Sequence, residues 1–120
     1  MHIIFGQQQA EELAQKYTVL ELDTFQLGEN GPTVVAYCTV ETIPLEELAR
    51  LDHNKMQHDH LLINYRGRAW QDCLIALDQL EGKWRGELNS FYTDLRERVE
   101  SYIKNPPPAD WSPVIIKPAT

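Results

Sequence analysis

The sequence predicts an α+β protein in which a small sheet precedes a group of packed helices. In residues 1–43, short β-branched runs with alternating apolar positions are typical of strands. In residues 44–104, apolar side chains recur at spacings of three and four, as they do on one face of a helix. Three consecutive prolines then end the helical pattern. We therefore expect a single domain over residues 1–104 and an extended tail over residues 105–120.

The N-terminal part is expected to begin with a strand followed by a helix. His2–Phe5 is short, apolar and β-branched, and it ends at Gly6, which favours a buried strand. Residues 7–17 are strong helix formers with apolar side chains on one face. These two elements open a β-α-β-β unit.

Two further strands complete this unit. Residues 19–27 and 33–42 are rich in β-branched side chains, and Asn30-Gly31 between them readily adopts positive φ. We expect the two strands to form an antiparallel hairpin. If the first two strands are parallel neighbours, a right-handed crossover joins them.

The helical part begins at Pro44, which suits the first turn of a helix. Poor helix formers at 52–55 predict a break there. Residues 58–65 could be a strand, which would give a ferredoxin-like order. We favour a helix because apolar residues recur at sevens from Met56. Two more helices are expected at 69–80, after the Gly67 turn, and at 84–102.

Composition and charge exclude several classes of function. The net charge is −7, and residues 1–52 hold nine acidic side chains against two basic ones. Nucleic acid is therefore not an expected partner, since phosphate binding needs a basic face. No apolar run approaches the ~18 residues of a membrane span, and the N-terminus lacks a basic leader. We expect a cytoplasmic protein with Cys38 and Cys73 as free, buried thiols.

The densest polar cluster contains His53, His58 and His60. Imidazoles bind metals, but on a helix His53 and His60 share a face that His58 does not, and no i, i+4 histidine pair exists. A solvated helix face is favoured. We assign no catalytic residue, no metal ligand and no cofactor.

Candidate partner-contacting residues are aromatic or acidic. Glu21 and Asp23 alternate onto one face of a strand, together with Val19 and Phe25, and could form an acidic rim. Tryptophan and tyrosine dominate protein interfaces, and the region beginning at Trp84 is expected to be the most exposed part of an aromatic stripe. The candidate aromatic contacts are Trp84, Tyr92 and Trp111.

Residues 55–104 resemble a tetratricopeptide repeat. Asn64 and Tyr65 match the end of the first helix of that motif, and Gly67 lies near its turn. Trp70 takes the aromatic position of the second helix, and Cys73 stands where the family usually has alanine. The resemblance implies helical hairpins that bind other proteins.

The segment Pro106–Trp111 is similar to the PPPxDW tail that follows the helical extension of many bacterial class III adenylate and guanylate cyclases. The catalytic half of those enzymes is absent, so no active-site residue carries over. This likeness implies a bacterial or phage protein related to signalling modules.

We therefore expect a small, non-catalytic protein that binds another protein or forms a homodimer. One alternative is an acidic inhibitor or immunity-type protein that blocks a basic partner. A second alternative is a small enzyme or metal-binding protein that uses His53, His58 and His60.

Overall fold

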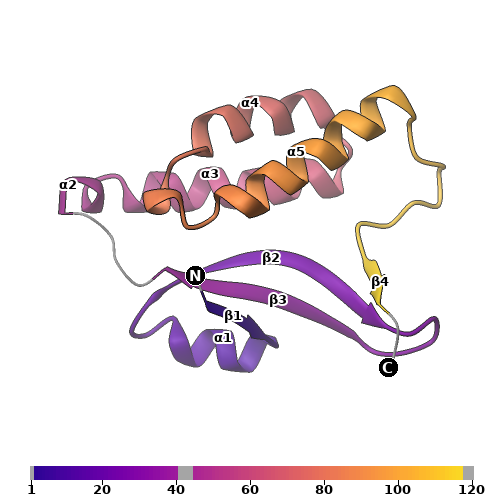
Figure 1. Ribbon diagram of the computed structural model, residues 1–120. Helices are drawn as coiled ribbons and strands as arrows, with labels where there is room; N and C mark the ends of the chain where they lie inside the picture. The colour runs from indigo at the N-terminus through magenta and orange to yellow at the C-terminus, as the bar shows by residue number, and fades with distance from the viewer. Residues whose placement is uncertain (1, 41–44, 118–120) are drawn as a thin grey trace. The chain divides into compact units, whose positions relative to one another are not determined.

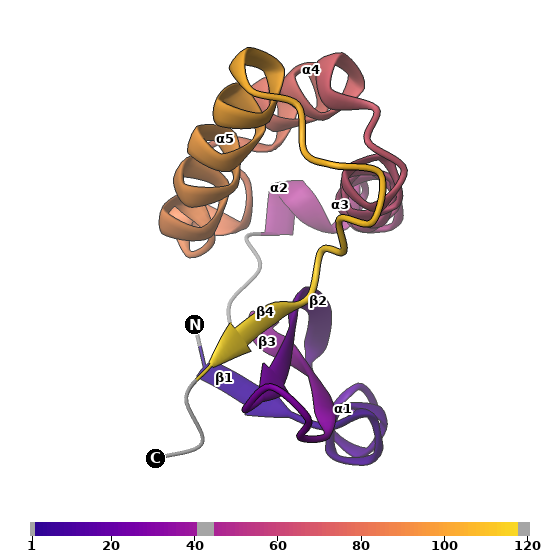
Figure 2. The same ribbon diagram turned by 90° about the vertical axis from the view of Figure 1, so that its right-hand side faces the viewer.

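A computed structural model describes residues 2–40 and 45–117 and divides the chain into two compact units (Figures 1 and 2). The sheet unit consists of Met1–Glu41 and Pro113–Thr120, and the helical unit consists of Thr42–Ser112. The chain thus leaves the sheet unit, forms the helical unit and returns to the sheet unit. The α+β class is confirmed. The segment 105–120 is shared between the two units.

Among the described residues, four strands form the sheet. They are β1 (His2–Phe5), β2 (Thr18–Leu27), β3 (Thr33–Val40) and β4 (Ile115–Lys117), in the spatial order β1-β3-β2-β4. β3 is antiparallel to both β1 and β2, whereas β4 is parallel to β2 at the edge of the sheet (Figure 2). The C-terminal segment therefore adds a strand to a sheet that begins at the N-terminus.

The predicted hairpin is confirmed, but the first two strands are not neighbours. The Leu27 amide donates to the Pro32 carbonyl across the turn at 3.0 Å. β3 then pairs with β2 along one edge and with β1 along the other, so it lies between the two parallel strands. α1 (Gln7–Leu13) connects β1 to β2 and is shorter than the predicted helix 7–17.

A β-bulge in β2 changes which residues share a face. Leu20 pairs with Cys38 and Glu21 with Tyr37, but the register shifts between Glu21 and Thr24, so that Phe25 pairs with Val34. Residues directly opposite one another project from the same face of a sheet. Phe25 consequently shares a face with Leu20 and not with Glu21. The predicted face of Val19, Glu21 and Phe25 is wrong, because one extra residue reverses the alternation.

The helical unit contains α2 (Leu45–Leu48), α3 (Leu51–Arg66), α4 (Trp70–Leu80) and α5 (Asn89–Lys104). α3 packs against α4, and α4 packs against α5 (Figure 1). The buried residues recur at helical spacing and meet between these helices. They include Leu61, Leu62, Tyr65, Cys73, Leu77, Leu80, Leu88, Leu95 and Val99.

Residues 58–65 are helical, as favoured from the sequence, and the ferredoxin-like alternative is excluded. The expected helix break at 52–55 is not found, since α3 begins at Leu51 and runs through these residues. Asp52 lies in the first turn of α3, where an acidic side chain is favourable, and Asn54 and His58 are buried in the core. Met56 and Ile63, two of the apolar residues that recur every seven positions, are exposed. A seven-residue period therefore identified the helix but not its buried face.

The third predicted helix, 84–102, starts later. Trp84, Arg85 and Gly86 form a tight turn in which all three residues have positive φ, and α5 begins only at Asn89. Gly86 fits this left-handed turn without strain, since it has no Cβ. Across residues 2–40 and 45–117, no helix is long and apolar enough to cross a membrane.

Candidate functional site

Trp84 and Tyr92 lie inside the helical unit, only 1% and 2% exposed. Their assignment as contact residues is therefore wrong for the folded protein. The left-handed turn at 84–86 directs the Trp84 indole inward, and its Nε1 donates to the Tyr92 hydroxyl at 3.0 Å. The predicted surface aromatics are thus part of the core.

A buried chain of hydrogen bonds continues from Tyr92 to His58. The Tyr92 hydroxyl lies 2.9 Å from Nδ1 of His58, which is fully buried. Burial lowers the pKa of His58 to about 4, against a smaller opposing effect of Asp59. Because an indole N–H can only donate, the Tyr92 hydroxyl accepts from Trp84, and the tautomer of the imidazole sets the direction of its hydrogen bond with His58. These contacts join α3, α5 and the intervening turn.

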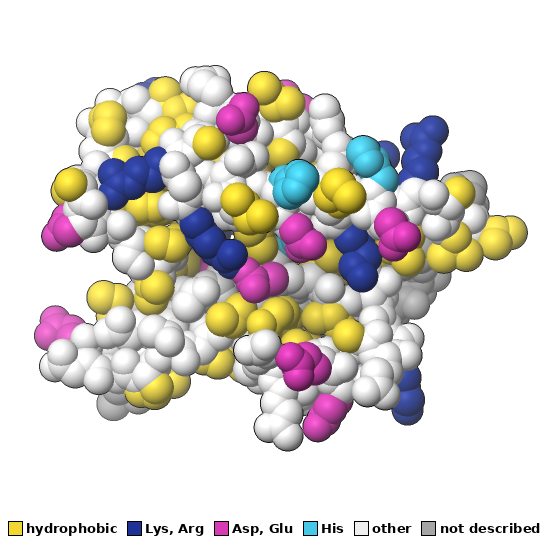
Figure 3. Space-filling view, turned by 180° about the vertical axis from the view of Figure 1, so that it is seen from behind, with side chains coloured by type: hydrophobic (Ala, Val, Ile, Leu, Met, Phe, Trp, Pro, Cys, Tyr) yellow, Lys and Arg dark blue, Asp and Glu magenta, His cyan; other side chains and the backbone are white. Residues whose placement is uncertain are grey.

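The three histidines do not converge on one site. His53 and His60 are exposed on α3, whereas His58 is buried, as their spacing predicts. Histidine side chains reach the surface shown in Figure 3, where acidic and basic side chains of the helical unit are interspersed. Within the described part of the chain, no group of three potential metal ligands is brought together. The enzyme or metal-binding alternative therefore gains no support from geometry.

Trp111 takes part in an aromatic cluster with Tyr65, Trp70 and Tyr102. Every pair of these four rings has its centroids between 5.1 and 6.5 Å apart. Rings in such contact fill the centre of the cluster themselves, so it is not an open cage for a cationic ligand. The cluster instead attaches the segment 105–112 to the ends of α3, α4 and α5.

Arg68 fixes the same segment through its backbone. The guanidinium donates to the carbonyl oxygens of Pro107 at 3.4 Å, Pro108 at 2.7 Å and Ala109 at 3.1 Å. Its carbon atom lies 5.3 Å from the centroid of the Trp111 ring. We call these contacts the tail clamp. Prolines supply acceptors without competing amide donors, which suits a guanidinium that can only donate.

The backbone of Arg68 is in the left-handed region, with φ of 62°. The Ala69 amide donates to the Asn64 carbonyl at 2.8 Å and the Arg68 amide to the Tyr65 carbonyl at 3.2 Å, the bonds of a Schellman motif. Glycine usually takes this position, but the adjacent Gly67 has φ of −86°. A strained arginine is thus held where its side chain reaches the tail.

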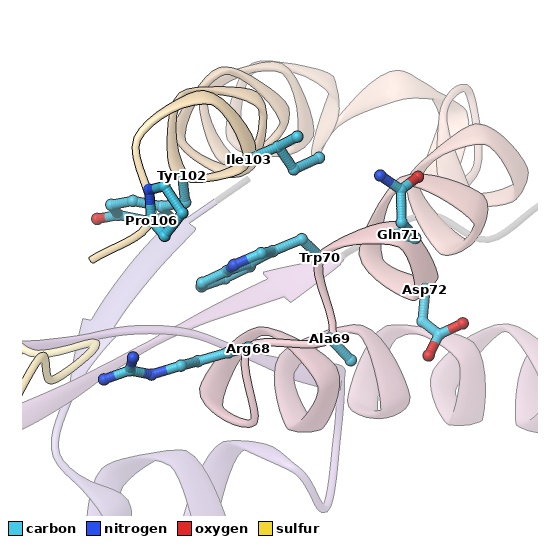
Figure 4. A pocket seen from close by; sticks show the side chains of 8 residues that line it. All are labelled: Arg68, Ala69, Trp70, Gln71, Asp72, Tyr102, Ile103 and Pro106. Atoms are coloured by element: carbon cyan, nitrogen blue, oxygen red, sulfur yellow. The ribbon is translucent and has the colours of Figure 1, made fainter. Parts of the chain in front are cut away.

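An open cavity of about 380 Å³ adjoins the tail clamp (Figure 4). Trp70 lies between Arg68 on one side and Tyr102 and Pro106 on the other, and Asp72 lies at the start of α4. We call it the helix-end cavity. Its lining residues come from the α3–α4 turn, the end of α5 and the tail: Arg68, Ala69, Trp70, Gln71, Asp72, Tyr102, Ile103 and Pro106.

Burial keeps two potential nucleophiles of the helical unit protonated. It raises the pKa of the Cys73 thiol to about 11, with a further contribution from Asp72. It raises the pKa of the Tyr65 hydroxyl to about 12, although Arg98 acts in the opposite direction. A thiolate is the reactive form of cysteine. Neither group is activated for nucleophilic attack at neutral pH.

Glu21 and Asp23 belong to the sheet unit, whereas the lining of the helix-end cavity belongs to the helical unit. Both are half-buried on β2, and the bulge follows Glu21. Of the predicted contact residues, only Trp111 adjoins a cavity-lining residue, because its ring contacts Trp70 and Tyr102. Sequence reasoning gave Arg68 no role. The only signals were an arginine after a helix-ending glycine and a distant proline run.

No protein-family model, curated protein or solved structure matches this chain.

Proposed function

We propose that this chain is a non-catalytic protein-binding module and that its helix-end cavity receives a segment of a partner protein. The observation that carries the proposal is an open cavity beside a rigid aromatic cluster. The ring centroids of Trp70 and Tyr102 lie 5.1 Å apart, and both side chains form part of the cavity lining. Aromatic side chains held in place by their neighbours lose little entropy on binding, which suits them as anchors.

The lining indicates the chemistry of the partner segment. Trp70, Ile103 and Pro106 offer apolar surface, and Asp72 offers a carboxylate at the edge of the cavity. The guanidinium of Arg68 already donates to three tail carbonyls. We therefore propose an apolar or aromatic anchor side chain followed closely by lysine or arginine. The net charge of −7 favours the approach of such a basic segment.

The helical hairpins support a binding role, and the proposal retains the likeness to tetratricopeptide repeats as an expectation. The two free cysteines, both buried, support a cytoplasmic location, since reduced thiols persist there. A second copy of this chain is one partner that the proposal allows.

The test is a peptide selection with matched variants. Ile103→Lys places a charge inside the cavity lining, whereas Ile75→Lys makes the same change on an exposed position of α4 outside it. A displayed random-peptide library is selected against the wild-type protein, and the enriched peptides are titrated against all three proteins. We expect peptides with an apolar anchor next to a basic residue. Their affinity should fall at least tenfold for Ile103→Lys and stay unchanged for Ile75→Lys.

Two outcomes would contradict the proposal. One is a selection without enrichment, and the other is a set of peptides that bind all three proteins equally. Sedimentation of the free proteins tests the homodimer version, which requires that Ile103→Lys dissociate a dimer that Ile75→Lys leaves intact.

A further inference from the structure

The sheet unit carries a separate cavity of about 380 Å³, lined by Phe5, Phe25, Leu27, Val34 and Lys117. We call it the sheet cavity. Each of the four strands contributes at least one of these residues. The cavity therefore depends on the pairing of all four strands, including the C-terminal β4.

The strand register explains why these side chains meet. Phe25 lies opposite Val34, and Phe5 lies opposite Ala36 on the same face of β3. The Phe5 and Phe25 rings approach edge to face, with centroids 6.5 Å apart. Without the bulge after Glu21, Phe25 would project from the opposite face. The irregularity in β2 thus completes the cavity.

The lining leaves large apolar side chains in contact with water. Phe5 is 55% exposed and Leu27 is 45% exposed, although both belong to strands of the sheet. An occupant that covers them would remove apolar surface from water, which is favourable. The volume lies at the lower end of the range of about 300–1,000 Å³ that is typical of small-molecule sites.

Among the described residues of the lining, Lys117 alone is charged. Its Nζ lies over the Phe25 ring, 5.6 Å from the ring centroid, so the ammonium adjoins the apolar surface. All other lining side chains are hydrocarbon. A peptide backbone would lose its hydrogen bonds to water there without finding partners, which is costly. A molecule with an apolar body and one anionic group satisfies both features.

We propose that the sheet cavity binds a small amphiphilic carboxylate, about the size of a medium-chain fatty acid. The hydrocarbon body covers Phe5, Phe25 and Leu27, and the carboxylate pairs with Lys117. This site is independent of the helix-end cavity, which lies in the other unit.

The experiment titrates the 120-residue chain with decanoate and with two matched probes, decanol and decyltrimethylammonium. Binding is followed through the methyl resonances of Leu27 and Val34. Decanoate should give saturable shifts at these methyls. Its affinity should exceed that of decanol several-fold, and decyltrimethylammonium should bind most weakly.

Three variants separate the charge from the apolar surface. Lys117→Gln should weaken decanoate at least tenfold and leave decanol unchanged. Leu27→Gln should weaken both probes, with circular dichroism confirming that the sheet persists. Ile116→Gln is the control, because this exposed neighbour on β4 does not line the cavity, and it should bind like the wild type.

The proposal is overturned if decanoate produces no saturable shift or if Lys117→Gln binds decanoate as tightly as the wild type does. It is also overturned if the same methyls shift with protein concentration alone, which would identify a second copy as the occupant. None of these results affects the peptide selection, because Ile103 lies in the helical unit.

Discussion

Arg68 and Trp111 are joined by a cation–π contact of 5.3 Å, and the same guanidinium donates to three carbonyl oxygens of the tail. Two segments distant in sequence are thereby fastened at the end of the helical unit. This relationship explains why Arg68 occupies a backbone position with left-handed φ, where glycine is ordinarily found. The side chain compensates for the strain of the backbone.

Replacing Arg68 should reveal both effects. Arg68→Ala removes the tail clamp but keeps a Cβ in the left-handed region, so we expect the free energy of unfolding to fall by about 2 kcal/mol. Arg68→Gly removes the clamp and relieves about 1 kcal/mol of backbone strain. Urea denaturation should therefore rank the wild type above Arg68→Gly and Arg68→Gly above Arg68→Ala. The reverse order of the two variants would show that the backbone is unstrained.

Tyr92→Phe should destabilise the helical unit although it changes the packed volume little. The substitution removes the hydroxyl that accepts from Trp84 and lies 2.9 Å from His58. Leaving buried polar groups unsatisfied costs about 1–3 kcal/mol. Thermal and urea denaturation measure the effect, and Tyr17→Phe is the control, since Tyr17 is exposed. Equal stability of the two variants would exclude a stabilising role for the buried chain.

The buried His58 makes stability depend on pH. The pKa of His58 is about 4 in the folded protein, against an ordinary value of 6.5 for an unfolded chain. Between pH 4 and pH 6.5 the unfolded chain therefore binds more protons than the folded protein. The contribution of neutral His58 to the free energy of unfolding is therefore fully present above pH 6.5. It is lost as the pH falls towards 4, which lowers the free energy of unfolding by about 3 kcal/mol at most.

Urea midpoints between pH 7.5 and pH 4 test this dependence. His58→Gln should flatten the decline, whereas His60→Gln should leave it unchanged because His60 is exposed. A decline of the same size in both variants would assign the acid sensitivity to other groups.

Cys73 should resist alkylation in the native protein. Its thiol is buried, and burial raises its pKa to about 11. Iodoacetamide at pH 8 should modify it only after denaturation, as intact-mass and peptide mass spectrometry would show. Rapid labelling of native Cys73 would mean that the α3–α4 contact opens readily.

Local patterns predicted much of the fold. Alternating β-branched runs identified the β2–β3 hairpin, but the positive φ expected at Asn30-Gly31 lies at Gly28 instead. Gly67 marked the α3–α4 turn within one residue of its left-handed position. These features depend on neighbouring residues, whose preferences the sequence displays directly.

The features that failed depend on distant pairing. The bulge after Glu21 follows from how β2 pairs with β3, and it moved Phe25 to the other face. The burial of Trp84 follows from a left-handed turn whose only glycine is Gly86. The role of Arg68 required knowing that the proline run returns to it. Each outcome was set by tertiary contacts that override local pattern.

The most direct test of the binding proposal is to map where a selected peptide contacts the protein. Backbone amide shifts are recorded for the wild-type protein during titration with the tightest peptide from the library. The proposal predicts saturable shifts concentrated at residues 70–72 and at Ile103, around the helix-end cavity. Shifts confined to the sheet unit, or none at saturating peptide, would contradict it.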